Sequence, residues 1–141
     1  MSRRVFVDTG AWIAVAVKVD SLHRRAALAM KKLISSRHLL VTSDFVLSET
    51  LTRIRYDAGH PSAISFLHTF DDAVMGGGIT LVRIDDTIFT ESRRIFEGYA
   101  DQDFSFVDCT SFALAKSLGI DTAFAFDHHF STMGFTVLPQ A

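Results

Sequence analysis

Residues 5–10, Val-Phe-Val-Asp-Thr-Gly, place an acid directly after a short apolar run. Consecutive apolar residues, two of them β-branched, are typical of a strand that is buried on both faces, as in a parallel sheet covered by helices. Gly10 permits a tight turn, and the apolar residues 11–16 predict a buried helix after it. We therefore expect Asp8 at the carboxyl end of a strand, where open α/β sheets bind their ligands.

Apolar strands and amphipathic helices alternate along the rest of the chain. Further strands are predicted at residues 39–41, 79–82, 122–126 and 135–138, and the segments between them have the apolar spacing and end signals of helices. Strands that alternate with helices predict a parallel sheet between layers of helices. We expect a single α/β domain over residues 1–141, with three layers and a central, mostly parallel sheet of about five strands.

Composition and charge exclude several classes of protein. The chain has 141 residues, of which 48% are hydrophobic, and this suits one domain with a substantial core. No window reaches the roughly 18 apolar residues of a membrane span, and the N-terminus does not resemble a signal peptide, so we expect a cytoplasmic protein without membrane association. The single cysteine, Cys109, is expected to be a buried thiol. A net charge of −2 does not indicate a nucleic-acid-binding protein. It does not exclude one, because acids clustered in one site would lower the net charge while basic residues elsewhere could still bind phosphates.

Two predicted strands end in an aspartate, the first at Asp8 and the fourth at Asp127. In a parallel sheet both carboxylates lie at the same edge. They face one crevice if the two strands are neighbours at the point where the winding of the sheet reverses. Taken alone, Asp8 is more simply explained as a helix N-cap, because aspartate is favoured at that position.

Two further acids are predicted on helices. Asp108 ends the segment Ser-Phe-Val-Asp that begins at Ser105, so its carboxylate could simply complete a capping box. Glu49 lies in an otherwise apolar stretch, where an ion pair with Arg53 would explain it. Taken together, the four acids suit a hard divalent cation such as Mg²⁺, which requires oxygen ligands. Without a cation, several carboxylates in one place would repel each other.

Histidine and cysteine contribute less to the predicted site. The chain has no Cys/His set of the kind that binds structural zinc. The adjacent His128 and His129 are interpreted as surface or turn residues rather than as metal ligands, because neighbours in the chain need not face the same point. The expected cation site is therefore made of carboxylates.

Four segments, in order along the chain, resemble the PIN-domain nucleases, and within them the VapC-type toxins of toxin–antitoxin pairs. The segments are DTGAWIAVA after the first strand, DFVLSETLTRIR around Glu49, DFSFVDCTSFALAKSLGI around Asp108 and AFAFDHHFSTMGFTVL at the end. In that family, the acids that match Asp8, Glu49, Asp108 and Asp127 form the metal-binding catalytic cluster. The resemblance therefore implies that these four residues are catalytic and bind the metal.

The resemblance has further implications for the site and its partners. The family's hydroxyl partners match Thr9 and Ser105, and Asp103 is a less certain match in the loop nearby. The family implies an endoribonuclease dependent on Mg²⁺ or Mn²⁺ that hydrolyses RNA phosphodiesters with metal-activated water, leaving 5′-phosphate and 3′-hydroxyl ends. It also implies a single-stranded or looped RNA substrate, a homodimer, and a cognate VapB-like antitoxin that places a helix or an extended segment in the cleft.

Other classes of protein stay open at this stage. A receiver or phosphatase domain also carries acids at strand ends. A phosphatase with an aspartyl nucleophile usually has a second aspartate where this chain has Gly10, and a receiver has a lysine after a late strand where this chain has residues 127–129, Asp-His-His. A PIN-like protein could also be a nuclease outside a toxin–antitoxin pair, or a catalytically silent binding module.

Overall fold

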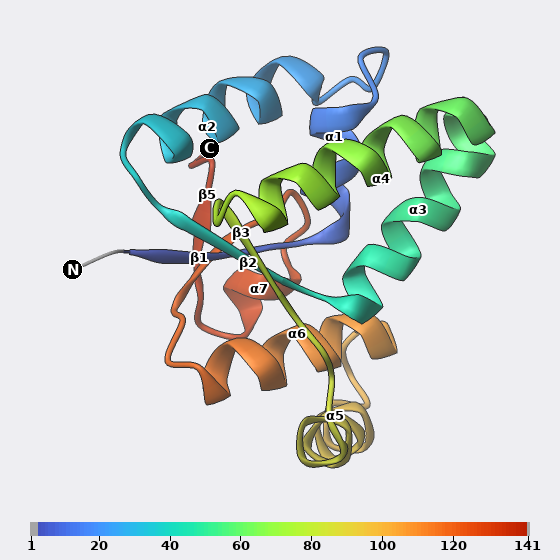
Figure 1. Ribbon diagram of the computed structural model, residues 1–141. Coiled ribbons are helices and arrows are strands. Elements are labelled where there is room, and N and C mark those ends of the chain that lie inside the picture. Colours follow the sequence, from blue (N-terminus) through green and yellow to red (C-terminus); the bar gives the residue numbers. More distant parts are fainter. Residues whose placement is uncertain (1–2, 141) are drawn as a thin grey trace.

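A five-stranded parallel sheet forms the middle of the computed structural model, which describes residues 3–140 (Figure 1). The strands are β1 (Arg4–Val7), β2 (Leu39–Ser43), β3 (Ile79–Val82), β4 (Thr122–Phe124) and β5 (Thr136–Leu138). The helices are α1 (Thr9–Ala16), α2 (His23–Ser35), α3 (Asp44–Ala58), α4 (His60–Met75), α5 (Asp86–Gly98), α6 (Phe106–Ser117) and α7 (His129–Thr132). Within the described residues, no helix is both long enough and apolar enough to cross a membrane.

The strand order is β3-β2-β1-β4-β5, and every neighbouring pair is parallel. The chain first builds outward from β1 to β3 and then returns to the other side of β1 for β4 and β5. The winding therefore reverses between β1 and β4, where Val7 pairs with Phe124. The two strands that end before Asp8 and Asp127 are thus neighbours, as the two-acid hypothesis required, and all five strands are parallel rather than most of them.

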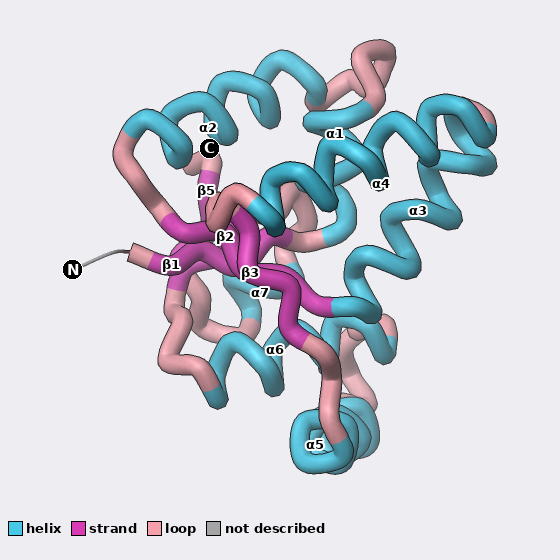
Figure 2. The backbone as a smooth tube through the Cα atoms, in the orientation of Figure 1, coloured by secondary structure: helices cyan, strands magenta, loops and turns pink. Residues whose placement is uncertain are grey.

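Helices cover both faces of the sheet. Helices α1 to α4 lie on one face and α5 to α7 on the other, as Figures 1 and 2 show. This arrangement confirms the predicted three-layer α/β fold. Because the sheet is covered on both faces, its strands consist of almost uninterrupted apolar residues, as the first strand does at Val5, Phe6 and Val7.

Aromatic side chains fill the space between the sheet and α6. Phe6 of β1 stacks on Phe130 with ring centroids 6.0 Å apart, and Phe130 contacts Phe112 of α6 edge-on at 5.0 Å. Each such ring, when fully buried, stabilises the fold by roughly 1.5–3 kcal/mol. Cys109 is also buried on α6, as predicted, and burial is the main factor that raises the pKa of its thiol to about 11. Its role is therefore in packing, because the reactive thiolate is disfavoured.

Candidate metal site at the carboxyl edge of the sheet

Asp8 follows β1 at the point where the winding reverses, and its side chain is only 5% exposed. It occupies the N-cap position of α1 but forms no side-chain cap hydrogen bond, so the helix-cap explanation is wrong. Burial raises the pKa of Asp8 well above its usual value, and the charges of Asp127, Asp108 and Glu49 raise it further, against an opposing hydrogen bond from the Thr9 backbone. The charges of the other three predicted acids therefore all act on the carboxylate of Asp8.

Asp108 combines the two roles that its sequence context suggested. Its backbone N–H donates to Ser105 Oγ at 3.0 Å, and its Oδ2 accepts from the Ser105 N–H at 3.0 Å, which completes the predicted capping box of α6. The carboxylate is also buried next to the other acids. Burial is the main factor that raises the pKa of Asp108 and Asp127 adds to it, while the Ser105 N–H and His129 lower it. The capping box thus holds this carboxylate at the site.

Asp127 and His129 approach Asp108 from the segment that follows β4. Asp127 Oδ1 accepts a hydrogen bond from the His129 N–H at 3.0 Å, which turns the chain back toward α6. His129 Nδ1 then lies 2.8 Å from Asp108 Oδ2 and 3.8 Å from Asp127 Oδ2. One ligand atom from each of Asp108, Asp127 and His129 lies within 4.8 Å of the others. His128 is exposed as expected, whereas His129 is only partly exposed and its ring faces Asp108. The expectation that neither histidine binds a metal stays a prediction.

The other predicted site residues lie around this group with different degrees of burial. Glu49 is half-buried on α3, and within residues 3–140 it forms no ion pair with Arg53. Thr9 is buried, and its Oγ1 has no hydrogen-bond partner among the described residues. Ser105 belongs to the capping box, and Asp103 is exposed in the loop before it. Of the predicted acids, Asp108 and Asp127 belong to the 4.8 Å group with His129 among the described residues, whereas Asp8, Glu49 and Asp103 do not.

The donor set fits a divalent cation. Asp8 and Asp108 are buried carboxylates whose pKa values are raised by burial and by neighbouring acids, so their ionised forms are costly without positive charge nearby. The hydroxyl of Thr9 is a buried polar atom without a partner directly next to Asp8. Carboxylate oxygens are the ligands that Mg²⁺ and Mn²⁺ prefer. Asp108 and Asp127 could hold such an ion directly. Asp8 and Glu49 lie outside this 4.8 Å group and are linked to it through their charges.

Comparison with known families agrees with this geometry. A family model of the PIN domain matches residues 5–136. The chain belongs to the PIN-domain family. This PIN domain is 33% identical over 135 residues to the 23S rRNA-specific endonuclease VapC20 of Mycobacterium tuberculosis (strain ATCC 25618 / H37Rv), in an alignment that covers 93% of this chain and 95% of VapC20. The family match decides against the receiver and phosphatase alternatives.

Solved structures of related proteins share the fold of this chain. The crystal structure of M. tuberculosis VapC20, described as a sarcin–ricin loop cleaving toxin, matches with a TM-score of 0.81 at 30% identity, covering 94% of this chain and 96% of that one. VapBC2 from Rickettsia felis, bound to a DNA fragment from its promoter, matches with a TM-score of 0.68 at 12% identity, covering 95% and 96% of the two chains. The second likeness concerns the fold alone.

Proposed function

We propose that this PIN domain is a metal-dependent endoribonuclease and the toxin of a toxin–antitoxin pair. The observation that carries the proposal is that Asp8 and Asp127 follow neighbouring strands at the switch point of the sheet, with a ligand atom of Asp127 within 4.8 Å of one from Asp108. The charges of Asp127, Asp108 and Glu49 all act on Asp8. The relation to VapC20, an endonuclease specific for 23S rRNA, supports both the reaction and the class of substrate. The catalytically silent alternative predicts that RNA stays intact.

The side chains have distinct parts in this proposal. Asp8, Asp108 and Asp127 would hold Mg²⁺ or Mn²⁺, and Glu49 would complete the cluster. When bound, such an ion lowers the pKa of a water molecule and stabilises the charge that develops on the phosphodiester. The Ser105 N–H and His129 Nδ1 orient the Asp108 carboxylate, as outer hydrogen-bond partners of metal ligands commonly do. No side chain is required as a covalent nucleophile.

A looped or single-stranded RNA is the proposed substrate. Its backbone and unstacked bases are accessible to a small domain, whereas the major groove of an A-form helix is deep and narrow. The first RNA to test is the sarcin–ricin loop of 23S rRNA, because the similar protein VapC20 is described as a toxin that cleaves this loop. A homodimer and a cytoplasmic location remain predictions.

RNA cleavage tests the proposed function. With Mn²⁺, the wild type is expected to cleave a sarcin–ricin loop hairpin, and Asp108→Asn is expected to reduce the rate by more than about 100-fold, because even changes to the outer partners of a metal site cost roughly 10–100-fold. Asp121→Asn is the matched control, since Asp121 is exposed and precedes β4 at the opposite edge of the sheet. Equal cleavage by all three proteins would contradict the proposal.

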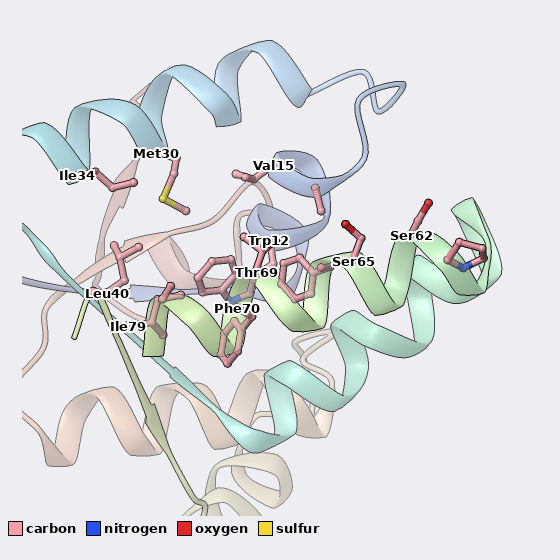
Figure 3. Close-up of a pocket in the computed structure, with 15 residues that line it drawn as sticks. Trp12, Val15, Met30, Ile34, Leu40, Ser62, Ser65, Thr69, Phe70 and Ile79 are labelled. Carbon is pink, nitrogen blue, oxygen red and sulfur yellow. The ribbon is translucent and has the colours of Figure 1, made fainter. Parts of the chain in front are cut away.

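The antitoxin partner is proposed to dock in an apolar groove of about 700 Å³ between α1, α2 and α4 (Figure 3). Side chains from all three helices line it, among them Val15, Met30 and Phe70. Such a groove suits the apolar face of an amphipathic helix, which is a common mode of peptide recognition. The structures of VapBC complexes that share this fold support a VapB-like protein as the occupant.

A pair of substitutions on α2 tests this docking surface. Ile34 lines the groove and is 62% exposed, whereas Leu28 is 56% exposed and lies outside the groove. Ile34→Glu is expected to weaken binding of a VapB-like protein encoded beside this gene by at least about tenfold, because a charge would enter an apolar contact. Leu28→Glu is expected to bind normally, and RNA cleavage is expected to be unchanged in both variants. Equal binding by the two variants, measured by calorimetry, would rule out this groove.

A further inference from the structure

A second hollow, of about 400 Å³, lies beside the acidic site rather than within it. It lies between the end of α5 and the start of α6. Its lining combines aromatic rings with hydrogen-bonding side chains: Phe96, Tyr99, Gln102, Asp103, Phe104 and Ser105. Neither the fold nor the proposed metal site explains why these two kinds of side chain gather there.

The hollow and the acidic site share a wall. Ser105 lines the hollow and also exchanges two hydrogen bonds with Asp108. Phe104 lines the hollow, and its ring lies 5.4 Å from the ring of His129, which in turn contacts Asp108 at 2.8 Å. A ligand group in the hollow is therefore next to whatever the acids act on.

The aromatic wall is exposed yet held in place. Phe96 is 51% exposed and Tyr99 is 42% exposed. Phe96 packs edge-on against Phe106 at 5.7 Å, and Tyr99 packs against Phe104 at 5.6 Å. Each ring is thus supported by another ring while much of its surface remains open to solvent. Exposed aromatic faces next to a phosphodiester site are the surfaces on which unpaired bases stack.

We propose that this hollow is a nucleobase subsite that receives a base next to the cleaved bond, with guanine preferred. This proposal rests on the proposed ribonuclease function and adds a determinant of its sequence specificity. Tyr99 and Phe96 stack on the base, and Asp103 and Gln102 contact its hydrogen-bonding edge. Asp103 is exposed and lines the hollow, which fits this role.

The choice of base follows from the chemistry of Asp103. An ionised carboxylate only accepts hydrogen bonds, and it accepts two parallel ones particularly well. Guanine presents two adjacent donors, N1–H and the 2-amino group, on one edge. Uracil presents a single N–H between two carbonyl oxygens, which the carboxylate repels. The amide of Gln102 both donates and accepts, so Gln102 discriminates less than Asp103.

Cleavage of an RNA pool with randomised sequence, followed by sequencing of the product ends, tests the subsite. We expect the wild type to show a guanine preference at one position next to the cleaved bond. Tyr99→Ala is expected to lower kcat/KM by roughly 5- to 150-fold, the range for losing one base–aromatic stack, and Tyr99→Phe is expected to restore it. Asp103→Asn is expected to cleave RNA with a weakened guanine preference. Tyr56→Ala, which changes an exposed ring on α3, is the control and is expected to behave as the wild type.

The outcomes separate this proposal from the ribonuclease function itself. Absence of cleavage by the wild type would contradict the proposed function, whereas cleavage without base preference would overturn only the subsite. An unchanged base distribution in Asp103→Asn would also overturn it. A third contradicting result is a Tyr99→Ala protein whose oligomeric state changes in size-exclusion chromatography while its base preference does not. That result would show that the aromatic wall contacts another protein chain, and the subsite would be wrong.

Discussion

Asp8→Asn is expected to lower RNA cleavage by more than about 100-fold and, in the absence of metal, to raise the free energy of unfolding by roughly 1–3 kcal/mol. The two effects have opposite signs because the carboxylate is useful for binding a cation and costly for folding. Asp8 is almost fully buried, and three other acids raise its pKa further. Asparagine has nearly the same shape without the charge, so it removes this cost along with the proposed metal ligand.

The pH dependence of stability distinguishes this account from a simple packing effect. Because the pKa of Asp8 is raised in the folded state, the cost of its charge is fully present at pH values above that pKa. As the pH falls through the raised pKa toward about 3.9, the value for an unperturbed aspartate, only the folded state takes up a proton. The contribution of Asp8 to the free energy of unfolding therefore rises as the pH falls. In Asp8→Asn this contribution is absent.

Urea unfolding with a chelator present measures both effects. The difference in free energy of unfolding between Asp8→Asn and the wild type is expected to be largest at high pH and to shrink on acidification. Asp121→Asn, a change of the same chemistry at an exposed position, is expected to show no such trend. An Asp8→Asn protein that is less stable than the wild type at neutral pH would mean that the carboxylate is well satisfied without a cation.

The strands and the edge at which the acids gather were predictable because their signals are local. A buried strand is a run of apolar residues, and an acid directly after it, such as Asp8, lies at the strand's carboxyl end. The fourth strand was predicted to run to residue 126, but β4 ends at Phe124 and two further residues lead to Asp127. The order of the strands was an assumption at that stage. It is a tertiary property, and the pairing of β1 with β4 places the two acids after neighbouring strands at the same edge of the sheet.

Competing local explanations were harder to decide. Asp108 completes a capping box and also lies at the site, so the two explanations of this residue are compatible. Asp8 has the sequence position of a cap, but its side chain makes no cap hydrogen bond. The sequence does not distinguish His128 from His129, because two adjacent histidines in a turn offer no periodicity that assigns either to a side. Only the turn formed by Asp127 directs one histidine toward Asp108 and leaves the other exposed.

Divalent metal is expected to stabilise the folded protein strongly. A ligand that binds only the folded state adds about 2.7 kcal/mol at a free concentration of 100 times its Kd. In this protein the bound charge would also offset the repulsion that Asp127 and Asp108 exert on the buried carboxylate of Asp8. Addition of Mn²⁺ is therefore expected to raise the melting temperature by several degrees, and a chelator is expected to reverse the rise.

Calorimetric titration of Mn²⁺ tests directly whether the four acids form one cation site. Two exposed aspartates at opposite ends of β4 provide the comparison, Asp127 at the site and Asp121 away from it. The wild type and Asp121→Asn are expected to bind Mn²⁺ with the same affinity, and Asp127→Asn is expected to bind at least about tenfold more weakly. Equal affinity in all three proteins, or no saturable binding by the wild type, would contradict a metal site at this edge of the sheet.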